Sequence, residues 1–287
     1  MEKSLAIVGA GRVGRALGRR LHAAGWRIGA VVTRSTSSAR NAVRFIGAGR
    51  PFARITSDVA RSRVILIAVP DDAIARVAAR LAATCGKQLQ GRIVLHTSGA
   101  RNSTVLKAIR ECGAAPGSMH PMQTFSGVVV PPLQGKVFTV EGHAKAISVS
   151  RQMVKQLGGI TLLLDAGKKS LYHAGAVMAA GHVLALVEAA TRVLIAAGFN
   201  RSRAKVALLP LTTQVLENFD KLGSRVAWTG PQARGDFEIM SQHREALRQL
   251  PREFGEAYEA LNHLAARVLG DRLRGANRAQ GREEKQN

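Results

Sequence analysis

Cysteine is scarce in this sequence, and so are aromatic and acidic residues. Cys85 and Cys112 are the only cysteines among 287 residues, and they form no CxxC motif. A disulfide framework is therefore not expected, and a reducing, cytoplasmic environment is the default expectation. Residues 1–4 lead directly into an apolar run and lack the pattern of a signal peptide, which agrees with this expectation.

Long apolar runs are also lacking. The longest nearly uncharged apolar stretch, Ala174–Val187, is interrupted by His182 and is followed by Glu188. A membrane span needs about 20 apolar residues. We therefore expect no membrane-spanning segment.

Acidic residues are outnumbered: 19 Asp and Glu stand against 42 Lys and Arg, for a formal net charge of +23. Such a charge attracts anions, whether phosphates, carboxylates or nucleic acid. The basic residues are spread along the chain without a basic run, and aromatic residues make up only 4% of it. Because single-stranded nucleic acid is bound largely by stacking on aromatic rings, we do not expect a nucleic-acid partner.

Apolar runs of strand length alternate with segments of helical period over the first half of the chain. The runs are Leu5–Val8, Ile28–Thr33, Phe52–Ile55, Val64–Val69 and Ile93–His96, with later ones at Val137–Val140 and Ile160–Leu164. Strand–helix alternation of this kind predicts a doubly wound parallel sheet with helices on both faces.

From about Gly167 the pattern becomes helical throughout. A long helix over residues 168–197, closed by Gly198, opens this part. Further helices follow, with breaks expected at Pro210, Gly223, residues 229–236 and Pro251. We therefore predict an α/β domain over residues 1–166 and an all-helical domain over residues 167–287.

The first chemistry-bearing motif is a glycine-rich turn, Gly9-Ala-Gly11-Arg12-Val13-Gly14, which follows a predicted strand and opens a predicted helix. In that context it is typical of dinucleotide binding. Gly9 permits the tight turn, Gly11 lets a pyrophosphate approach the backbone, and Gly14 lets helix and strand pack closely. The helix N-terminus, at Arg12 and Val13, offers free N–H groups to the phosphates. An ordinary glycine turn is the alternative.

Arg34 lies 20 residues after Gly14, at the end of the second predicted strand. NAD-preferring sites carry an Asp or Glu there, which holds the ribose 2′-hydroxyl. A cation beside the hydroxyls of Ser35 and Thr36 suits a 2′-phosphate instead. The sequence therefore favours NADP(H) as cofactor, and a surface arginine is the alternative.

The fourth and fifth predicted strands, and a short run that leads to Met119, end in segments that should meet at one carboxyl edge of the sheet. Val69 and Pro70 end the fourth strand, and we expect their backbone to line the cofactor. Ser98 follows the fifth strand, and His120 lies in the segment GSMHPMQTF at the next one. A hydroxyl and an imidazole at this edge can bind or protonate a substrate oxygen, although purely structural roles remain open.

The long helix begins with a polar patch. Lys169, Tyr172 and His173 share one helical face by the i, i+3, i+4 rule. A patch in the substrate site is one interpretation, and a solvated first turn is the other. His173 and His182 lie nine residues apart, on opposite sides of an α-helix. No other His, Cys or acidic cluster has zinc spacing, so no metal is expected.

A polar loop, residues 229–236, interrupts the helical part with the sequence TGPQARGD. Gly and Pro fix its shape. Arg234 could clamp a carboxylate through two parallel hydrogen bonds, with Thr229 beside it in a substrate site. The Arg-Gly-Asp tripeptide is a coincidence in a chain expected to be cytoplasmic.

Together these motifs resemble Rossmann-like oxidoreductases with a C-terminal helical domain long labelled as of unknown function. That group is related to pyrroline-5-carboxylate reductase, ketopantoate reductase and 6-phosphogluconate dehydrogenase. The resemblance runs from about Leu5 to Leu250 and rests on the segments at 9–14, 69–74, 96–100, 117–125, 169–173 and 229–236. It implies a Rossmann domain followed by a helical domain like that of 6-phosphogluconate dehydrogenase.

The resemblance also implies roles for individual residues. In the wider group, a serine after the fifth strand contacts substrate, which corresponds to Ser98. A lysine at the start of the long helix acts as acid and base, which corresponds to Lys169. Prephenate dehydrogenases carry a similar His-Pro-Met beside substrate, which corresponds to His120. Family members usually have Asn where this chain has Gly181, so the resemblance does not specify a substrate.

The function implied is an NADPH-dependent reductase that transfers hydride to a small, anionic carbonyl or imine compound. A ketopantoate-like 2-keto acid is the most concrete substrate candidate. Lys169 or His120 would supply the proton, and Arg234 would hold a substrate carboxylate. A non-catalytic NADP(H) sensor is the alternative, because Gly181 removes a polar group from the expected site.

The helical domain is expected to form a homodimer. Ala174–Val187 is apolar nearly all round, so this helix must be buried on all sides. One small helical domain has little room to surround it alone. Gly175 and Gly181 are poor helix formers, and they make sense where a second backbone packs closely.

Overall fold

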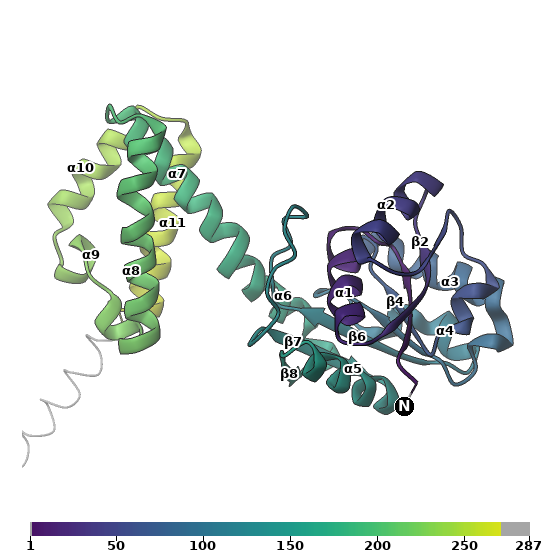
Figure 1. Ribbon diagram of the computed structural model, residues 1–287. Coiled ribbons are helices and arrows are strands. Elements are labelled where there is room, and N and C mark those ends of the chain that lie inside the picture. Colours follow the sequence, from purple (N-terminus) through teal and green to yellow (C-terminus); the bar gives the residue numbers. More distant parts are fainter. Residues whose placement is uncertain (1, 271–287) are drawn as a thin grey trace, which may run out of the picture. The chain divides into compact units, whose positions relative to one another are not determined.

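The computed structural model describes residues 2–270 of the chain (Figure 1). These residues form two compact units, one ending at Ala180 and the other beginning at Gly181. The predicted domain boundary at residues 166 and 167 marks the point where the last strand gives way to helix, whereas the units divide within that helix. All of the described strands lie in the first unit.

The first unit is built on an eight-stranded sheet in the order β3-β2-β1-β4-β5-β6-β7-β8. The strands are β1 Ser4–Val8, β2 Arg27–Val32, β3 Arg50–Phe52, β4 Val64–Ile67, β5 Ile93–His96, β6 Ala115–Pro121, β7 Val137–Gly142 and β8 Ile160–Leu163. The predicted parallel sheet is confirmed for the first six strands. β7 pairs with β6 antiparallel, because a loop and no crossover helix joins the two. β8 is parallel to β7.

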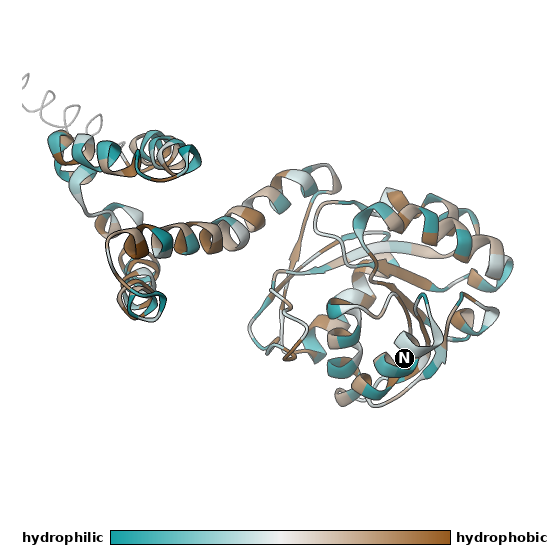
Figure 2. Ribbon diagram, turned by 90° about the horizontal axis from the view of Figure 1, so that it is seen from above, coloured by the Kyte–Doolittle hydropathy of each residue, from teal (hydrophilic) through white to brown (hydrophobic). Residues whose placement is uncertain are grey.

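Helices cover both faces of this sheet (Figure 1). α1 Arg12–Ala23, α2 Thr36–Ile46 and α5 Ala144–Gln156 pack on one face, over a core that includes Leu5 and Ile7. α3 Ile74–Cys85 and α4 Lys107–Glu111 pack on the other face. The central strands β1, β4 and β5 are apolar along most of their length, as Figure 2 shows in brown, because both of their faces are buried.

α2 was not predicted from the sequence, although the segment carries a helical signal. Ala39, Ala42 and Ile46 are buried at helical spacing on one face. Ser35 caps the N-terminus, and Gly47 ends the helix with φ of +89°. The signal was weak because two of the three buried residues are alanines and the remainder is rich in Ser and Arg.

Short 3₁₀ helices complete the first unit. They are η1 Ser57–Arg61, η2 Asp71–Ala73, η3 Gly86–Leu89, η4 Ser103–Leu106 and η5 Ala166–Lys168. η4 leads into α4, and η5 is the first turn of the long helix that follows β8.

The long helix is continuous over Ala166–Ala196 and consists of η5, α6 Lys169–Val177, a π-helical turn η6 Met178–His182, and α7 Val183–Ala196. It is 31 residues long, and its length and composition would suffice to cross a membrane. The apolar run Ala174–Val187 alone did not indicate a helix of this length, and the expectation of no membrane-spanning segment stays a prediction. The helix continues through His182 and Glu188, where the apolar run had been taken to stop. Length and composition do not decide between the two environments, because a helix that is packed within protein can have the same length and composition as one in a membrane.

The second unit contains α8 Arg201–Ala227, α9 Pro231–Arg234, α10 Phe237–Leu247 and α11 Arg252–Val268. The break expected at Pro210 is wrong, because α8 continues through this residue. The break expected at Gly223 is confirmed, since its φ of +75° and ψ of +167° are not helical. The part of the predicted helical domain beyond residue 270 lies outside the described residues.

Candidate functional site

The glycine-rich turn joins β1 to α1 and leaves an open surface at the helix N-terminus. Gly9 has φ of +91°, and a Cβ there would overlap the carbonyl of Ala68 and the side chain of Val69. A Cβ at Gly14 would overlap the carbonyl oxygen of Gly9. These two glycines are therefore required by packing.

Gly11 is different, because a Cβ at this position would meet no atom within 4 Å. Gly11 is also the N-cap of α1 and supplies no capping side chain. The first N–H groups of α1 therefore have no side-chain cap, and a phosphate has room to approach them at Gly11. Arg12 and Gly11 are exposed, and Val13 is half-buried. The predicted pyrophosphate site fits the structure, with Gly11 as the position where a ligand would approach.

Arg34 lies between the end of β2 and the start of α2, and it is exposed. It forms no ion pair with another residue of the described range 2–270. The Ser35 hydroxyl accepts from the backbone N–H of Ser38 at 3.2 Å and so caps α2. An unpaired guanidinium thus lies next to a helix N-terminus and several hydroxyls, a combination that suits a phosphate.

Val69 and Pro70 follow β4, beside the glycine-rich turn. Val69 is half-buried, and its Cγ1 lies against the place where a Gly9 side chain would be. The backbone N–H of Ala68 donates to the carbonyl of Val8 at 2.8 Å, which holds the two strand ends together. The segment is therefore placed to line a ligand bound at the turn.

Lys169 begins α6 and is almost entirely buried, with 1% of its surface exposed. Its Nζ donates to the carbonyl oxygen of Ser98 at 2.7 Å and to Oγ of Ser118 at 2.6 Å. Ser98 follows β5, and Ser118 lies in β6. The lysine therefore reaches the carboxyl ends of two central strands.

Burial lowers the pKa of Lys169 to about 8, and the carboxylates of Glu141 and Asp71 oppose this change. Desolvation is the main cause in the structure, and the charges that act on Lys169 are carboxylates rather than arginines. Lys169 is charged at pH 7 but loses its proton at little cost, which suits proton transfer.

His120 lies near the end of β6, and its Nδ1 is 2.8 Å from the hydroxyl of Tyr172 in α6. Burial and the charge of Lys169 lower the pKa of His120 to about 4. The imidazole is therefore neutral at pH 7. When the Tyr172 hydroxyl donates to Nδ1, Nε2 carries the hydrogen and can donate to a substrate oxygen or nitrogen. The pKa values favour Lys169 over His120 as the source of the proton.

His173 completes this cluster. The ring centroids of His120 and His173 are 6.0 Å apart, and those of His120 and Tyr172 are 5.7 Å apart. The backbone of Gly99 passes beside both imidazoles, and a Cβ there would lie 2.5 Å from His173 and 2.9 Å from His120. Glycine is thus the residue that allows the chain to approach the two rings.

Ser98 is buried, and its hydroxyl accepts from the backbone N–H groups of Ala100 at 3.2 Å and Arg101 at 2.9 Å. The hydroxyl therefore stabilises the turn after β5, while the carbonyl holds Lys169. Direct contact of Ser98 with a substrate stays a prediction. Its position next to Lys169 agrees with a place in the site.

Sequence reasoning missed Ser118, which is completely buried in β6. Serine inside an apolar strand carries no pattern that separates a site residue from a core residue. The available signal was its place two residues before His120, since alternate strand residues share a face.

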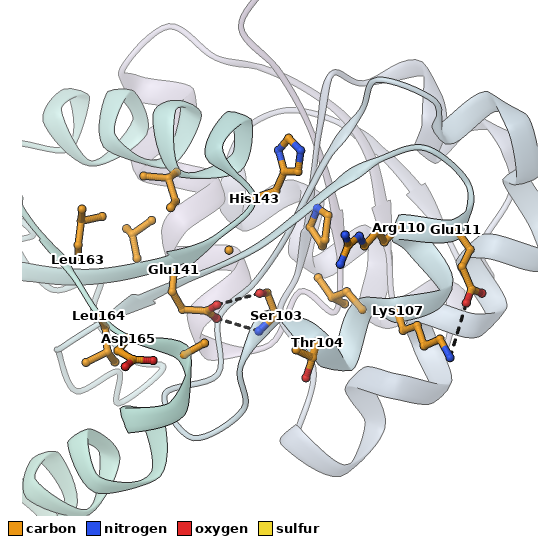
Figure 3. Close-up of a pocket in the computed structure, with 16 residues that line it drawn as sticks. Ser103, Thr104, Lys107, Arg110, Glu111, Glu141, His143, Leu163, Leu164 and Asp165 are labelled. Carbon is orange, nitrogen blue, oxygen red and sulfur yellow. Dashed lines mark hydrogen bonds and ion pairs between the residues drawn. The ribbon is translucent and has the colours of Figure 1, made fainter.

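A separate groove of about 1090 Å³ lies between η4–α4 and the ends of β7 and β8 (Figure 3). Glu141 lies in its wall, with its carboxylate accepting from the backbone N–H and the hydroxyl of Ser103, both at 2.8 Å. Lys107 and Glu111 form an ion pair at its rim. None of the predicted site residues lines this groove.

Thr229 and Arg234 belong to the second unit. Thr229 is exposed, and Arg234 lies at the end of α9. Nε of Arg234 donates to Oδ2 of Asp236 at 2.9 Å, and Nη2 forms an ion pair with the same oxygen at 2.9 Å. The guanidinium therefore has a carboxylate partner within its own loop, and a substrate carboxylate would have to compete with Asp236.

Within residues 2–270, no three His, Cys, Asp or Glu side chains are grouped so that they could hold a metal ion. His120 and His173 are close, but Tyr172 and Lys169 surround them rather than carboxylates. The described site is thus built from lysine, imidazole and hydroxyl groups.

Two family models match the chain. Residues 2–121 match that of a Rossmann-like domain. Residues 136–265 match that of a domain of unknown function, DUF2520. A search of curated proteins finds no match.

Several solved structures share the fold. A protein from Thermotoga maritima is 23% identical with a TM-score of 0.69, over 93% of this chain and 98% of that one. A candidate NADP oxidoreductase from Bacteroides fragilis is 20% identical with a TM-score of 0.73, over 91% and 97% of the two chains. A reductive aminase from Aspergillus terreus, in complex with NADPH and ethyl-5-oxohexanoate, is 18% identical with a TM-score of 0.69, over 93% and 94%.

Proposed function

Because the chain joins a Rossmann-like domain to a DUF2520 domain, we propose that it is an NADPH-dependent reductase of a small carbonyl or imine compound. The observation that carries this proposal is the buried Lys169, which lies at the carboxyl edge of the same sheet whose first turn fits a pyrophosphate. In open α/β sheets, ligands bind at this edge.

NADP(H) would be held by the first unit. The N–H groups at Gly11, Arg12 and Val13 would bind the pyrophosphate, and Arg34 with Ser35 would bind the 2′-phosphate. The reductase from Aspergillus terreus, which has the same fold, was solved with NADPH. When bound, the cofactor supplies the hydride.

Lys169 and the residues around it would transfer the proton to the substrate. Lys169 donates a proton to the oxygen or nitrogen that becomes negative as the substrate carbon is reduced. His120 donates a hydrogen bond from Nε2 to the same group, and Tyr172 fixes its tautomer through Nδ1. Water is kept from the lysine, because its side chain is almost entirely buried.

Two substrate classes follow from this chemistry. One is a small anionic carbonyl compound, with a ketopantoate-like 2-keto acid as the most concrete candidate, whose carboxylate Arg234 would bind in exchange for Asp236. The other is an imine, which the likeness to a reductive aminase supports. The positive charge of the chain, +23, favours an anionic substrate.

The proposed function is tested by an assay of NADPH consumption over a panel of 2-keto acids, and of ketones mixed with amines. NADH is run in parallel. We expect consumption with at least one member of the panel, and faster consumption with NADPH than with NADH. Consumption with NADH alone, or binding of neither cofactor in calorimetry, would reject the proposal.

A non-catalytic NADP(H) sensor is the second candidate, and Gly181 favours it. This glycine lies in the π-helical turn Met178–His182, where the resemblance leads one to expect Asn. A sensor would bind NADPH tightly and consume none of it over the whole panel. The binding titration and the assay therefore separate the two candidates.

We further propose a homodimer through the helical unit, in a reducing cytoplasm, without a membrane or a nucleic-acid partner. Many apolar side chains of α7 and α8 are exposed in the single chain, among them Leu184 at 70% and Val206 at 73%. Among residues 181–270, only Thr191, Ala204, Ala227 and Met240 are buried. A second copy would cover this apolar surface, which is too large for a soluble monomer.

Light scattering in buffer without detergent should therefore give twice the 30.6 kDa mass of one chain at micromolar concentration. A monomer mass under these conditions would refute the dimer. A protein that stays in solution only with detergent or lipid would show instead that a membrane covers the long helix.

A further inference from the structure

Ser118 is a buried hydroxyl for which the proposed reaction has so far no role. It lies in β6 with no exposed surface, and its Oγ accepts from Nζ of Lys169 at 2.6 Å. The same hydroxyl donates to the carbonyl oxygen of Ser98 at 3.3 Å. Ser118, Ser98 and Lys169 therefore form a closed triangle of hydrogen bonds.

This triangle fixes the direction of the lysine nitrogen in both of its protonation states. An ammonium group has three N–H bonds in a tetrahedral arrangement, and Ser98 and Ser118 take two of them. In the described part of the chain, no third protein acceptor is bonded to Nζ. After the third proton leaves, the amine still has two N–H bonds for the same two acceptors, and its lone pair takes the third direction.

We propose that Ser118 is a positioning residue for Lys169, which holds the amine so that the proton it gives up and the lone pair left behind point in one fixed direction. The inference rests on the proposed function, because it assigns Ser118 a part in the same proton transfer. Alanine at this position would leave a buried N–H without an acceptor and would free Nζ to rotate.

Several charged and titratable groups surround Lys169, from every element that packs against it. The carboxylates of Glu141 in β7 and Asp71 in η2 favour the ammonium form. The pKa values of His96 in β5 and His120 in β6 are lowered by burial and by the charge of Lys169, so both imidazoles are neutral. Tyr172 and His173 lie on α6 itself.

These neighbouring groups are the same in the wild type and in a Ser118 variant. The hydrogen bond from Lys169 to Ser118 favours the charged form of the lysine. Removing the acceptor should therefore lower the pKa of Lys169 below its value of about 8. Since the proposed reaction uses the ammonium form, the pH above which activity is lost should move downward.

The test compares Ser118→Ala with Ser150→Ala in the full-length protein. Ser150 is a matched control, because it is completely buried in the first unit and its hydroxyl has no hydrogen-bond partner among residues 2–270. Two quantities are measured: the titration of the Lys169 Cε resonance in heteronuclear NMR spectra, and the dependence of kcat on pH. Ser118→Cys, which keeps the size but weakens the acceptor, replaces Ser118→Ala if the alanine variant does not fold.

We expect Ser118→Ala to lower the titration midpoint of Lys169 by about one pH unit or more. At neutral pH, kcat should fall by about 10- to 100-fold while NADPH affinity is unchanged. Ser150→Ala should change neither quantity. The inference would be overturned by a folded Ser118 variant in which Lys169 titrates at an unchanged pH and kcat is lost above the same pH as in the wild type, even if kcat itself falls. The NMR titration needs no turnover, so a protein without reductase activity would refute the proposed function while the contact with Ser118 is still measured.

Discussion

Replacing Lys169 with methionine should lower kcat by about 10²–10⁴-fold, while the affinity for NADPH is retained. The lysine is buried, its pKa is about 8, and two hydrogen bonds hold it at the carboxyl edge of the sheet. Methionine has a similar length and fills the same space, but it cannot donate a proton. In the wild type, activity should fall as the pH rises through about 8, because the ammonium form is lost.

Lys168→Met is the matched control. Lys168 is the neighbouring lysine, but it is exposed, and it lies at the end of η5. Its replacement should change kcat little. If Lys169→Met keeps kcat and only raises KM, the lysine acts as an electrostatic guide for an anionic substrate and not as the proton donor. His120, held by Tyr172, would then be the leading candidate for that role.

Replacing Arg34 with alanine should weaken the binding of NADPH by about 1.5–3 kcal/mol and leave NADH nearly unchanged. The guanidinium is exposed next to the N-terminus of α2 and has no ion-pair partner among the residues of the described chain. It is therefore free to bind a phosphate, and only NADPH carries one at the 2′ position. Both dissociation constants are measured by calorimetric titration.

Arg40→Ala provides the comparison, because Arg40 is another exposed arginine of the same segment, within α2. Arg40→Ala removes the same charge from within α2, whereas Arg34 lies before the helix, at the end of β2. Its effect on NADPH should be small. Equal losses for NADPH and NADH in Arg34→Ala, or equal losses of NADPH in the two variants, would contradict the assignment of the 2′-phosphate to Arg34.

Much of the sheet could be predicted, because strands buried on both faces are continuous apolar runs. Ile93–His96 was predicted with the bounds observed, and the order of strand and helix gave the doubly wound sheet. The direction of β7 could not be predicted, since it depends on whether a helix forms between β6 and β7. Pro210 was expected to end a helix, but α8 continues through it, since a proline removes only one N–H donor from the helix.

The part of the site that lies at the carboxyl edge of the sheet could be predicted from the sequence. Ser98, His120 and Lys169 were expected on separate elements, and the structure brings them together. Ser118 could not be found, because its role depends on a single contact with a residue 51 positions away. The ion pair of Arg234 with Asp236 was equally hidden, since a sequence does not show which of several partners a guanidinium takes.

Transfer of deuterium from the cofactor to the product tests the central claim most directly. NADPH labelled with deuterium at the C4 position of the nicotinamide, in each of the two stereochemical forms, is incubated with the substrate found in the panel assay. We expect that one of the two labelled forms gives a product with one deuterium on the reduced carbon, and that Lys169→Met slows this transfer. A product without deuterium from either form, or transfer at the same rate in Lys169→Met, would contradict it.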